Sequence, residues 1–236
     1  MKSWTFADVA AHWDSVSYDA SNAKIDSHLR RFTDSAPLLR IPEHARVLDI
    51  DCRTANGTIF FSKRVSTATF TCVAMAESFR HLAEKKLRAN NIHAPVTQLQ
   101  DLPLHFPDAH FDVVLCYETI EHVPNPHAFI AELSRTLKLG GTLVLTTPNR
   151  LWEPIHWLSA KLKLDHGEGP HRMLPRTELV QLFTSNGFAV RTEKTFVLIP
   201  AGPRWLLRIG KWIESVLPEC ARRICALRRT FVCTKS

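Results

Sequence analysis

VLDIDCRTANG, residues 47–57, begins as an apolar run and ends in short polar residues. The pattern predicts a buried strand that leads into a tight turn whose backbone approaches a ligand. Three positions where such a turn favours glycine carry Asp51, Arg53 and Ala55. Because Cβ atoms at these positions restrict φ and occupy space, the sequence raises the question of what this turn still holds.

Strand and helix patterns alternate on both sides of this turn. We expect strands at 47–50, 69–74, 95–99, 111–117 and 142–147, and helices at 58–64, 77–89 and from Pro126, the last capped by Asn125 and ended by Gly140-Gly141. Strands that alternate with helices over short connections predict a doubly wound α/β fold. We therefore expect a Rossmann-like, seven-stranded, mostly parallel sheet with a C-terminal antiparallel strand and helical insertions.

The remainder of the chain is less regular. Residues 6–38 show a helical pattern, and residues 148–174 form an insertion that holds Trp152, Trp157, His156, His166 and His171. Further along we expect a helix at 176–186, a strand at 188–199, a helical region at 203–228 and a last strand at 229–234. The whole of 1–236 is predicted to be a single domain, with a helical cap at 1–44, a ligand-binding core at 45–147, the insertion over the site at 148–174, and a C-terminal half at 175–236.

Composition and charge narrow the classes of protein. The 236 residues are 45% hydrophobic with only 8 glycines, which excludes a disordered or fibrous chain. The formal net charge is +7, but residues 201–236 alone hold six Arg and two Lys against two Glu, a net charge of +6. A single basic segment does not favour a nucleic-acid surface. Six cysteines without a regular framework suit a reducing compartment, and no signal peptide or long apolar span is expected, so we predict a cytoplasmic protein.

Ordered motifs carry a family resemblance that covers roughly residues 40–190. They are 47–57, Leu102-Pro103 ahead of Phe111-Asp112-Val113-Val114, Glu121-His122-Val123-Pro124, and Leu137-Lys138-Leu139-Gly140-Gly141-Thr142-Leu143. In this order and spacing the chain resembles class I S-adenosylmethionine-dependent methyltransferases, and in particular the small-molecule group that includes the ubiquinone methyltransferases. Each motif alone is weak, whereas the ordered set is specific.

The resemblance implies a role for each matching position in binding S-adenosyl-L-methionine. Asp49 matches the acid that orders the loop and reaches the methionyl amino group, and Gly57 matches a retained glycine. Ala74 falls where an acid holds the ribose hydroxyls. The other cofactor contacts that the resemblance implies lie at Gln98, Asp101, Leu102 and Tyr117.

Two residues offer compensation for the departures from the family pattern. Glu77 could reach the ribose in place of an acid at position 74, and Arg53 could pair with the methionine carboxylate. Asp51 remains a cofactor-loop position even though it replaces a glycine. The loss of the ribose acid costs on the order of 1–3 kcal/mol of binding free energy.

Methyl transfer needs alignment more than special side chains, and a general base only for a protonated acceptor. His122 and Glu118 follow the fourth strand and are the catalytic candidates, with the insertion histidines behind them. The histidines lack zinc-type spacing, so no metal is expected.

The basic C-terminal helix, 203–217, allows two interpretations. Its apolar residues and flanking arginines suit an anionic membrane surface contacted through 203–229. Alternatively, it is a lid packed over the sheet with its arginines pointing outward.

Three functions are compatible with the sequence. The first is an S-adenosylmethionine-dependent methyltransferase of a small or lipid-like acceptor, cytoplasmic and peripheral to the inner face of a membrane if the helix binds there. The second is an inactive methyltransferase fold that serves as a scaffold, because three glycines and the ribose acid are replaced. The third, a nucleic-acid methyltransferase, is weak because the charge is confined to one segment. The oligomeric state is not predicted.

Overall fold

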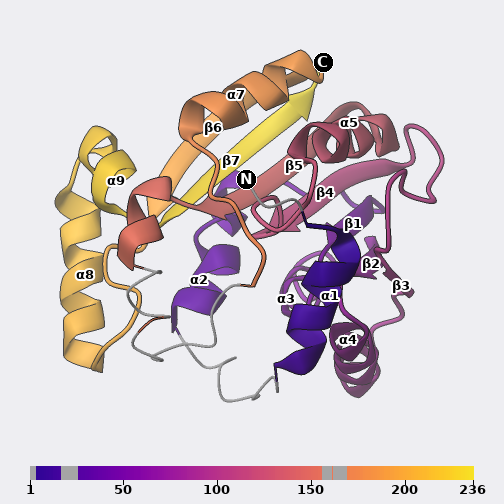
Figure 1. The fold of residues 1–236 in the computed structure, drawn as a ribbon, viewed down its shortest axis with the longest axis horizontal. Helices are drawn as coiled ribbons and strands as arrows, with labels where there is room; N and C mark the ends of the chain where they lie inside the picture. Colours follow the sequence, from indigo (N-terminus) through magenta and orange to yellow (C-terminus); the bar gives the residue numbers. More distant parts are fainter. Residues whose placement is uncertain (1–3, 17–25, 156–160, 162–168) are drawn as a thin grey trace.

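The computed structural model describes residues 4–16, 26–155, 161 and 169–236. They build one seven-stranded sheet in the order β3-β2-β1-β4-β5-β7-β6 (Figure 1). The strands are β1 Arg46–Ile50, β2 Thr69–Ala74, β3 Val96–Gln98, β4 Phe111–Tyr117, β5 Leu137–Pro148, β6 Phe188–Phe196 and β7 Arg228–Lys235. β7 runs antiparallel to β5 and β6, and the pairs β1–β2, β1–β4, β2–β3 and β4–β5 are parallel. The predicted fold class is confirmed.

Helices cover both faces of the sheet (Figure 1). They are α1 Phe6–Ser15, α2 Asp26–Thr33, α3 Asn56–Ser62, α4 Glu77–Ala89, α5 Pro126–Thr136, α7 Arg176–Ser185, α8 Arg204–Val216 and α9 Glu219–Cys225, with short 3-10 turns η2 Ala36–Leu38 and η3 Arg150–Trp152. As predicted, the Asn125 side chain caps α5 by accepting a hydrogen bond from the Ala128 amide, and Pro126 occupies the first turn.

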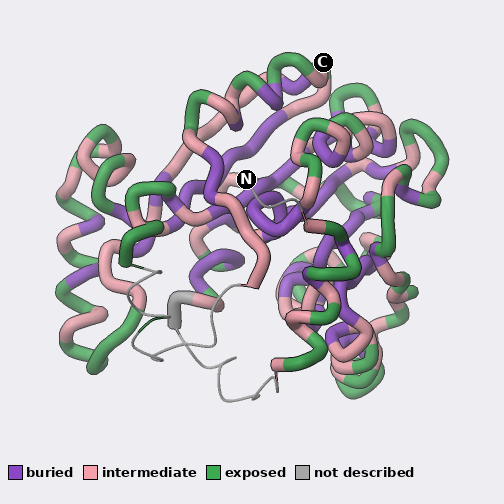
Figure 2. Tube along the Cα trace, in the orientation of Figure 1, coloured by how far each residue is buried: buried purple, intermediate pink, exposed green. Residues whose placement is uncertain are grey.

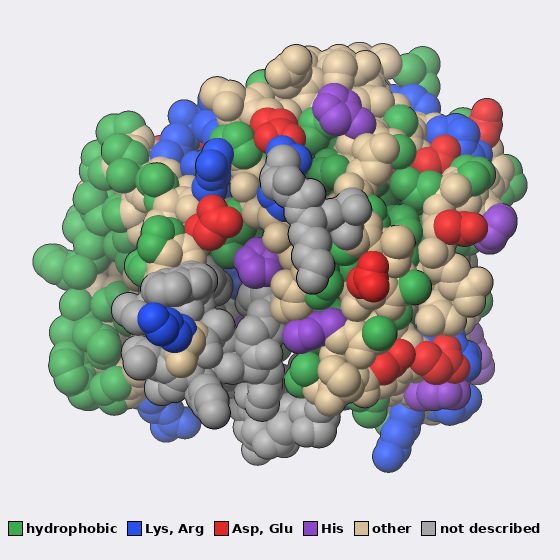
Figure 3. Space-filling model, viewed as in Figure 1, with side chains coloured by type: hydrophobic (Ala, Val, Ile, Leu, Met, Phe, Trp, Pro, Cys, Tyr) green, Lys and Arg blue, Asp and Glu red, His purple; other side chains and the backbone are tan. Residues whose placement is uncertain are grey.

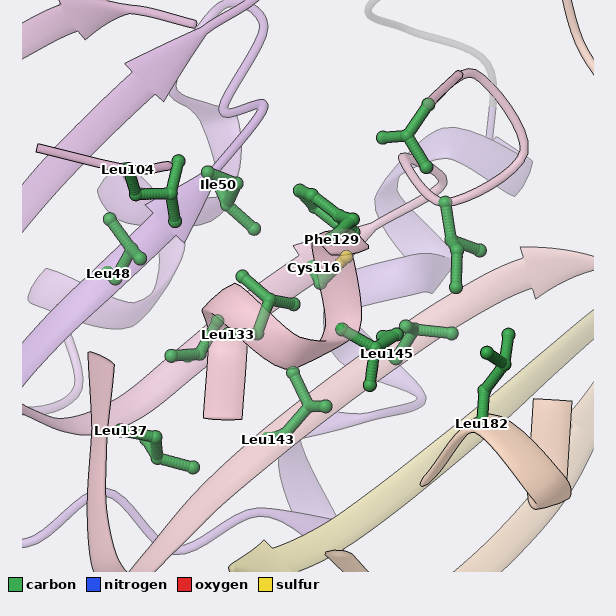
Figure 4. Packing of buried hydrophobic residues seen from close by; sticks show 14 of the residues in the cluster. Leu48, Ile50, Leu104, Cys116, Phe129, Leu133, Leu137, Leu143, Leu145 and Leu182 are labelled. Carbon is green, nitrogen blue, oxygen red and sulfur yellow. The ribbon is translucent and has the colours of Figure 1, made fainter. Parts of the chain in front are cut away.

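The core follows from the alternation of side chains along each strand. In β1, Leu48 and Ile50 pack with α5 and α7 on one face, and Val47 packs with residues of α2 and α3 on the other. Figure 4 shows Leu48 and Ile50 in the first of these layers together with Leu133 and Leu145. The central strands are buried on both faces, which explains why their sequences are almost continuously apolar (Figure 2).

Strand order reverses between β1 and β4, and this reversal positions the candidate site. Ligands of open α/β sheets bind outside the carboxyl ends of the strands at such a switch point. Helix α1 lies across these strand ends: the Trp4 indole donates to the His122 carbonyl after β4, and Asp14 accepts from the Ser78 amide after β2. The N-terminal segment therefore has direct contacts with both sides of the switch point.

One expectation about a helix end is wrong. The helix α5 ends at Thr136, and Gly140-Gly141 lie inside β5, where the register with β4 shifts between Phe111 and Val113. A Cβ at 141 would lie 2.8 Å from both the Leu137 side chain and the Lys138 carbonyl, so the glycine pair serves this irregular part of the strand. The helical region expected at 203–228 is confirmed as two helices, α8 and α9, which Pro218 separates.

The interpretation of the basic helix as a lid packed over the sheet is also wrong. α8 lies at one end of the molecule (Figure 1), and Trp205, Ile209, Trp212 and Val216 are exposed. Among the described residues, no helix is long and apolar enough to cross a bilayer.

The C-terminal arginines were also placed wrongly. Arg228 and Arg229 do not flank a surface: both are buried in β7, where they pair with Glu118 and Glu193.

Candidate active site

The turn after β1 keeps a left-handed path without its expected glycines. Asp51, Arg53 and Ala55 have φ of 55°, 48° and 56°. The Ala55 amide donates to the Cys52 carbonyl at 2.8 Å, and α3 begins at the next residue. Left-handed backbone costs an L-residue roughly 1–2 kcal/mol. The chain therefore retains a glycine-type loop at an energetic cost.

Asp49 anchors this loop to α3. Its Oδ2 accepts from the Thr58 amide at 3.0 Å and from the Thr58 hydroxyl at 2.7 Å. Burial raises the pKa of Asp49 to about 7. Gly57 lies close beside it: an added Cβ would be 3.1 Å from the Phe32 ring and 3.2 Å from Asp49 Oδ2, so one of these side chains would have to shift. Asp49 thus orders the loop, as the resemblance implies; its contact with a ligand remains a prediction.

The Arg53 side chain bridges the loop after β1 and the end of β4. Its Nη2 donates to the Glu118 carbonyl at 3.2 Å and lies 3.5 Å from His122 Nε2. The guanidinium carbon sits 5.0 Å from the centroid of the Trp13 ring of α1, a cation–π distance. Nε is 3.8 Å from Asp51 Oδ2. Because β1 and β4 flank the switch point, the guanidinium occupies the crevice where a ligand would bind.

Asp51 brings a buried acceptor to the neighbouring strand end. Its carboxylate accepts a backbone hydrogen bond from Met75, which follows β2, and burial raises its pKa. Asp51 Oδ1 is buried and has no hydrogen-bond partner among the described residues. An acceptor in this state costs free energy until a donor reaches it. The adjacent Ala74, also fully buried, is the position where the resemblance places the ribose acid.

His122 is fully buried behind Arg53. Its Nδ1 lies 3.2 Å from the Pro170 carbonyl, and its ring meets Trp13 edge-on at 5.9 Å between centroids. Since a guanidinium only donates, Nε2 faces Arg53 as the acceptor and the ring proton belongs on Nδ1. Burial first, and the Arg53 charge second, lower the pKa of His122 to about 3. The imidazole is therefore neutral at pH 7, as a base must be, but weakly basic.

The Glu118 carboxylate is held by two arginines. Oε2 lies 3.1 Å from Arg31 of α2, and Oε1 accepts from Arg228 of β7 at 2.5 Å. Burial alone would raise the pKa of Glu118, but the charges of Arg228 and Arg31 hold it well below its usual range. A carboxylate this firmly ionised is a poor proton acceptor. The described contacts therefore favour a structural role over the catalytic role expected for Glu118.

Tyr117 points away from solvent. Its hydroxyl lies 2.8 Å from the Ser35 hydroxyl, and its ring packs against Phe32 and Phe61. It still borders a small hollow of about 50 Å³ beside Asp49. The same hollow is lined by residues of α2, namely His28, Leu29, Arg31 and Phe32, which sequence reasoning did not single out. No motif links α2 to the loop, and only the fold brings them together.

A second hollow of about 130 Å³ lies beyond β2 and β3. Gln98 and Asp101, both expected to contact the nucleoside, line it together with Leu104 and Phe106. Leu102 packs partly buried against the core beside it. The Glu77 carboxylate instead pairs with Arg80 at 2.5 Å and with His81 at 3.0 Å. Of the predicted nucleoside contacts, Gln98, Asp101 and Leu102 thus lie together at and just beyond the end of β3, whereas Glu77 pairs elsewhere.

The insertion is described only in part. His156 and His166 lie outside the described residues, whereas His171 lies 6.2 Å from His122 between ring centroids. Among the described residues, no group of three or more His, Cys, Asp or Glu could hold a metal ion.

A family model of a methyltransferase domain matches residues 20–193, most of the chain. The chain belongs to the methyltransferase-domain family. The class I members of this family use S-adenosyl-L-methionine, which is the cofactor that the resemblance implies.

Curated relatives agree with the family. A ubiquinone biosynthesis O-methyltransferase of Bradyrhizobium sp. (strain ORS 278) is 27% identical over 197 residues, 77% of this chain and 73% of the relative. The enzyme of the same name from Rhodopseudomonas palustris (strain HaA2) matches at the same identity and coverage.

Solved structures share the fold. A geranyl diphosphate methyltransferase in complex with GPP and sinefungin is 15% identical and covers 98% of this chain and 99% of its own, with a TM-score of 0.72. A structure of the Haloferax volcanii Trm112 methyltransferase activator with a methyltransferase, also 15% identical, covers 100% of this chain and 99% of its own at a TM-score of 0.68.

The described residues offer part of a site for S-adenosylmethionine, with Arg53 among the residues that line it. The orphaned Asp51 Oδ1 offers an acceptor for a hydroxyl or ammonium, and the loop keeps the required backbone path. Two hollows among the described residues, of about 50 and 130 Å³, lie beside the ends of β1 and β3. The guanidinium of Arg53 lies between the loop after β1 and the end of β4, so a ligand bound at the switch point would meet it.

Proposed function

We propose that this protein methylates a small, lipid-like acceptor with S-adenosylmethionine, and that Asp51 and Arg53 replace contacts made elsewhere in the family. The observation that carries the proposal is the left-handed path of Asp51, Arg53 and Ala55. A scaffold that no longer bound a nucleoside would have no reason to keep a backbone that costs free energy at three positions.

Asp51 is proposed to bind the ribose. Its carboxylate reaches the end of β2 through Met75 and carries the unsatisfied Oδ1, so it supplies the acceptor that Ala74 lacks. Burial raises its pKa, and a donor at Oδ1 would offset part of that cost. The gain expected from such a charge-assisted hydrogen bond is about 1.5–3 kcal/mol.

Arg53 is proposed to hold the methionine carboxylate. Its described contacts include the Glu118 carbonyl, the edge of His122, the Trp13 ring and, at 3.8 Å, the Asp51 carboxylate. A carboxylate held in bidentate geometry would be a stronger partner for the guanidinium than any of these. When bound, the cofactor supplies an activated methyl group for in-line displacement. Moving the guanidinium toward a carboxylate would also uncover His122 Nε2, which is then placed to take a proton from a hydroxyl acceptor.

The lipid-like class of acceptor is supported by the curated relatives, whose names refer to ubiquinone biosynthesis. The small-molecule class itself agrees with the family match. A cytoplasmic location at the inner face of a membrane follows as part of the proposal, since such an acceptor resides there.

Calorimetry with two ligands tests these roles. S-adenosylhomocysteine carries the amino acid tail, and 5′-methylthioadenosine lacks it. We expect wild type to bind the first, and R53Q to weaken it by about tenfold or more while changing the second little. D51N should weaken both ligands, because both carry the ribose. No binding of either ligand to wild type at high micromolar concentration would contradict the proposal.

One observation favours the alternative of an inactive scaffold: the Arg53 side chain reaches from the loop to the end of β4 and to Trp13, across the place where a ligand would bind. If Arg53 is only an obstruction, R53G should create binding that wild type lacks, and A74D combined with it should strengthen that binding. If Arg53 is a ligand contact, R53G should instead impair binding of S-adenosylhomocysteine. The two functions therefore predict opposite signs for one substitution.

A further inference from the structure

We propose that α8 docks this protein on an anionic lipid bilayer through the side facing away from the sheet. This surface, the α8 outer face, consists of Trp205, Ile209, Trp212 and Val216. Their residue exposures are 62%, 43%, 66% and 63%. Figure 3 shows hydrophobic side chains gathered at the end of the molecule where Figure 1 places α8.

The α8 outer face lies on the opposite side of the helix from the residues that attach α8 to the rest of the protein. At 3.6 residues per turn, positions 205, 209, 212 and 216 form one stripe, and Glu214 lies half a turn round from Trp205. Glu214 is buried and pairs with Arg30 of α2, and it accepts from the Leu198 amide at 2.8 Å. Gly210 lies close to Ile199: a Cβ added at position 210 would be 3.0 Å from the Ile199 Cβ. The body of the protein thus fixes the inner side and leaves the apolar stripe outside.

The charges of α8 complement an anionic surface. Arg204, Arg208 and Lys211 are exposed and follow one another along a single border of the α8 outer face. The one acidic residue of the helix, Glu214, is turned inward and paired, so no carboxylate opposes anionic headgroups on this helix. Each cation near an anionic leaflet adds to binding, and paired tryptophans favour the boundary between headgroups and acyl chains.

Neighbouring segments extend the apolar surface. Apart from Leu29 and Leu139, the exposed large hydrophobic residues of the described chain all lie on α8 or on the segments beside it, where Leu151, Ile155 and Ile224 are found. The Trp152 indole donates to the Cys225 carbonyl at 3.0 Å, which ties η3 to α9. An exposed apolar surface on a helix at one end of the molecule can insert into a lipid surface, whereas a protein partner would need a matching groove.

Vesicle co-sedimentation tests the proposal with the whole chain and needs no methyl transfer. Wild type should bind vesicles of phosphatidylcholine with 30% phosphatidylglycerol more strongly than pure phosphatidylcholine, and less strongly as salt rises. W205Q/W212Q should lower the partition coefficient about tenfold or more, and so should R204Q/R208Q/K211Q.

Matched controls remove the same chemistry elsewhere. R40Q/K63Q/K85Q deletes three exposed cations from other surfaces, and L139Q replaces an exposed leucine, so both should bind vesicles as wild type does. All variants should keep the wild-type circular dichroism and melting temperature. Equal binding of wild type and W205Q/W212Q to anionic vesicles would overturn the proposal. A wild-type dimer in sedimentation velocity that W205Q/W212Q dissolves, without vesicle binding, would instead make the face an interface between two copies.

Discussion

At the scale of single residues, the site is a cluster of ionisable groups, most of them buried. Asp49, Asp51, Glu118 and His122 all lie within or beside the loop and the end of β4, and Arg53 lies between them. Their protonation states follow from burial and from the nearest guanidinium, which makes these states measurable consequences of the geometry.

Asp49 gives the first prediction. Its pKa is 3.8 in the unfolded chain and about 7 when buried, so between these values the folded state binds more protons than the unfolded state. The free energy of unfolding contributed by this group therefore falls as pH rises from about 4 to 7. D49N, which keeps an acceptor for Thr58, should flatten this part of the profile. Urea denaturation at four pH values measures it, and parallel profiles for the two proteins would contradict the prediction.

His122 gives the second. Burial and the Arg53 charge lower its pKa to about 3, so removing the charge in R53Q should raise the pKa while burial keeps it below 6.5. Ring-proton NMR titration of wild type and R53Q reports this, with H122N to assign the signal. R150Q, at an exposed arginine, serves as the control. An unchanged pKa would mean that Arg53 does not rest against His122.

At the scale of elements, prediction from sequence succeeded where burial determines the pattern. The bounds of β2 and β4 match those expected, because an apolar run between turn residues marks a strand buried on both faces. Gly140-Gly141 misled because a glycine pair is typical of a helix end as well as of an irregular strand. The orientation of α8 was not predictable either, since apolar residues surround most of its circumference.

Part of the candidate site could not be predicted from the sequence, because its contacts join distant segments of the chain. Asp49 and its neighbours were found because they share one short motif. The stacking of Arg53 on Trp13 and the Arg31–Glu118 pair join segments far apart in the chain, and no local pattern encodes them. The sequence showed that a guanidinium replaced a glycine, but not that it would span the switch point.

The anchoring of α8 gives the third prediction. Burial would raise the pKa of Glu214, yet its hydrogen bonds with Arg30 and the Leu198 amide lower it, so the carboxylate is ionised and paired. E214Q should lower the free energy of unfolding by about 1–3 kcal/mol in urea denaturation. S215A, at the next and exposed position, should change it by less than about 0.5 kcal/mol. Equal effects would show that the ion pair does not hold the helix.

At the scale of the whole molecule, one sheet connects the N-terminal cap, the loop and the C-terminal half. Glu118 illustrates this, because it ties α2 and β7 to the end of β4 through Arg31 and Arg228. A ligand bound at the switch point should consequently stabilise the molecule as a unit.

This coupling gives the fourth prediction. S-adenosylhomocysteine at 100 times its Kd should add about 2.7 kcal/mol to the free energy of unfolding. For a domain of this size that corresponds to a rise in Tm of about 5–10 °C. Scanning calorimetry at increasing ligand concentration measures it, with 5′-methylthioadenosine at equal occupancy as the comparison. A Tm that does not respond to the ligand would contradict the proposed cofactor site.

The place of β7 between β5 and β6 has a consequence for biosynthesis. Residues 197–227 must be translated after β6 and before the strand that joins it to the sheet. At about 5–20 residues per second, the nascent chain spends a few seconds with β6 unpaired and the inner edge of β5 open to the wrong partner. A premature stop codon ahead of Arg228 would also leave Glu118 without one of its two arginines. We expect such a product to be cleared by proteolysis rather than to persist as a shortened protein.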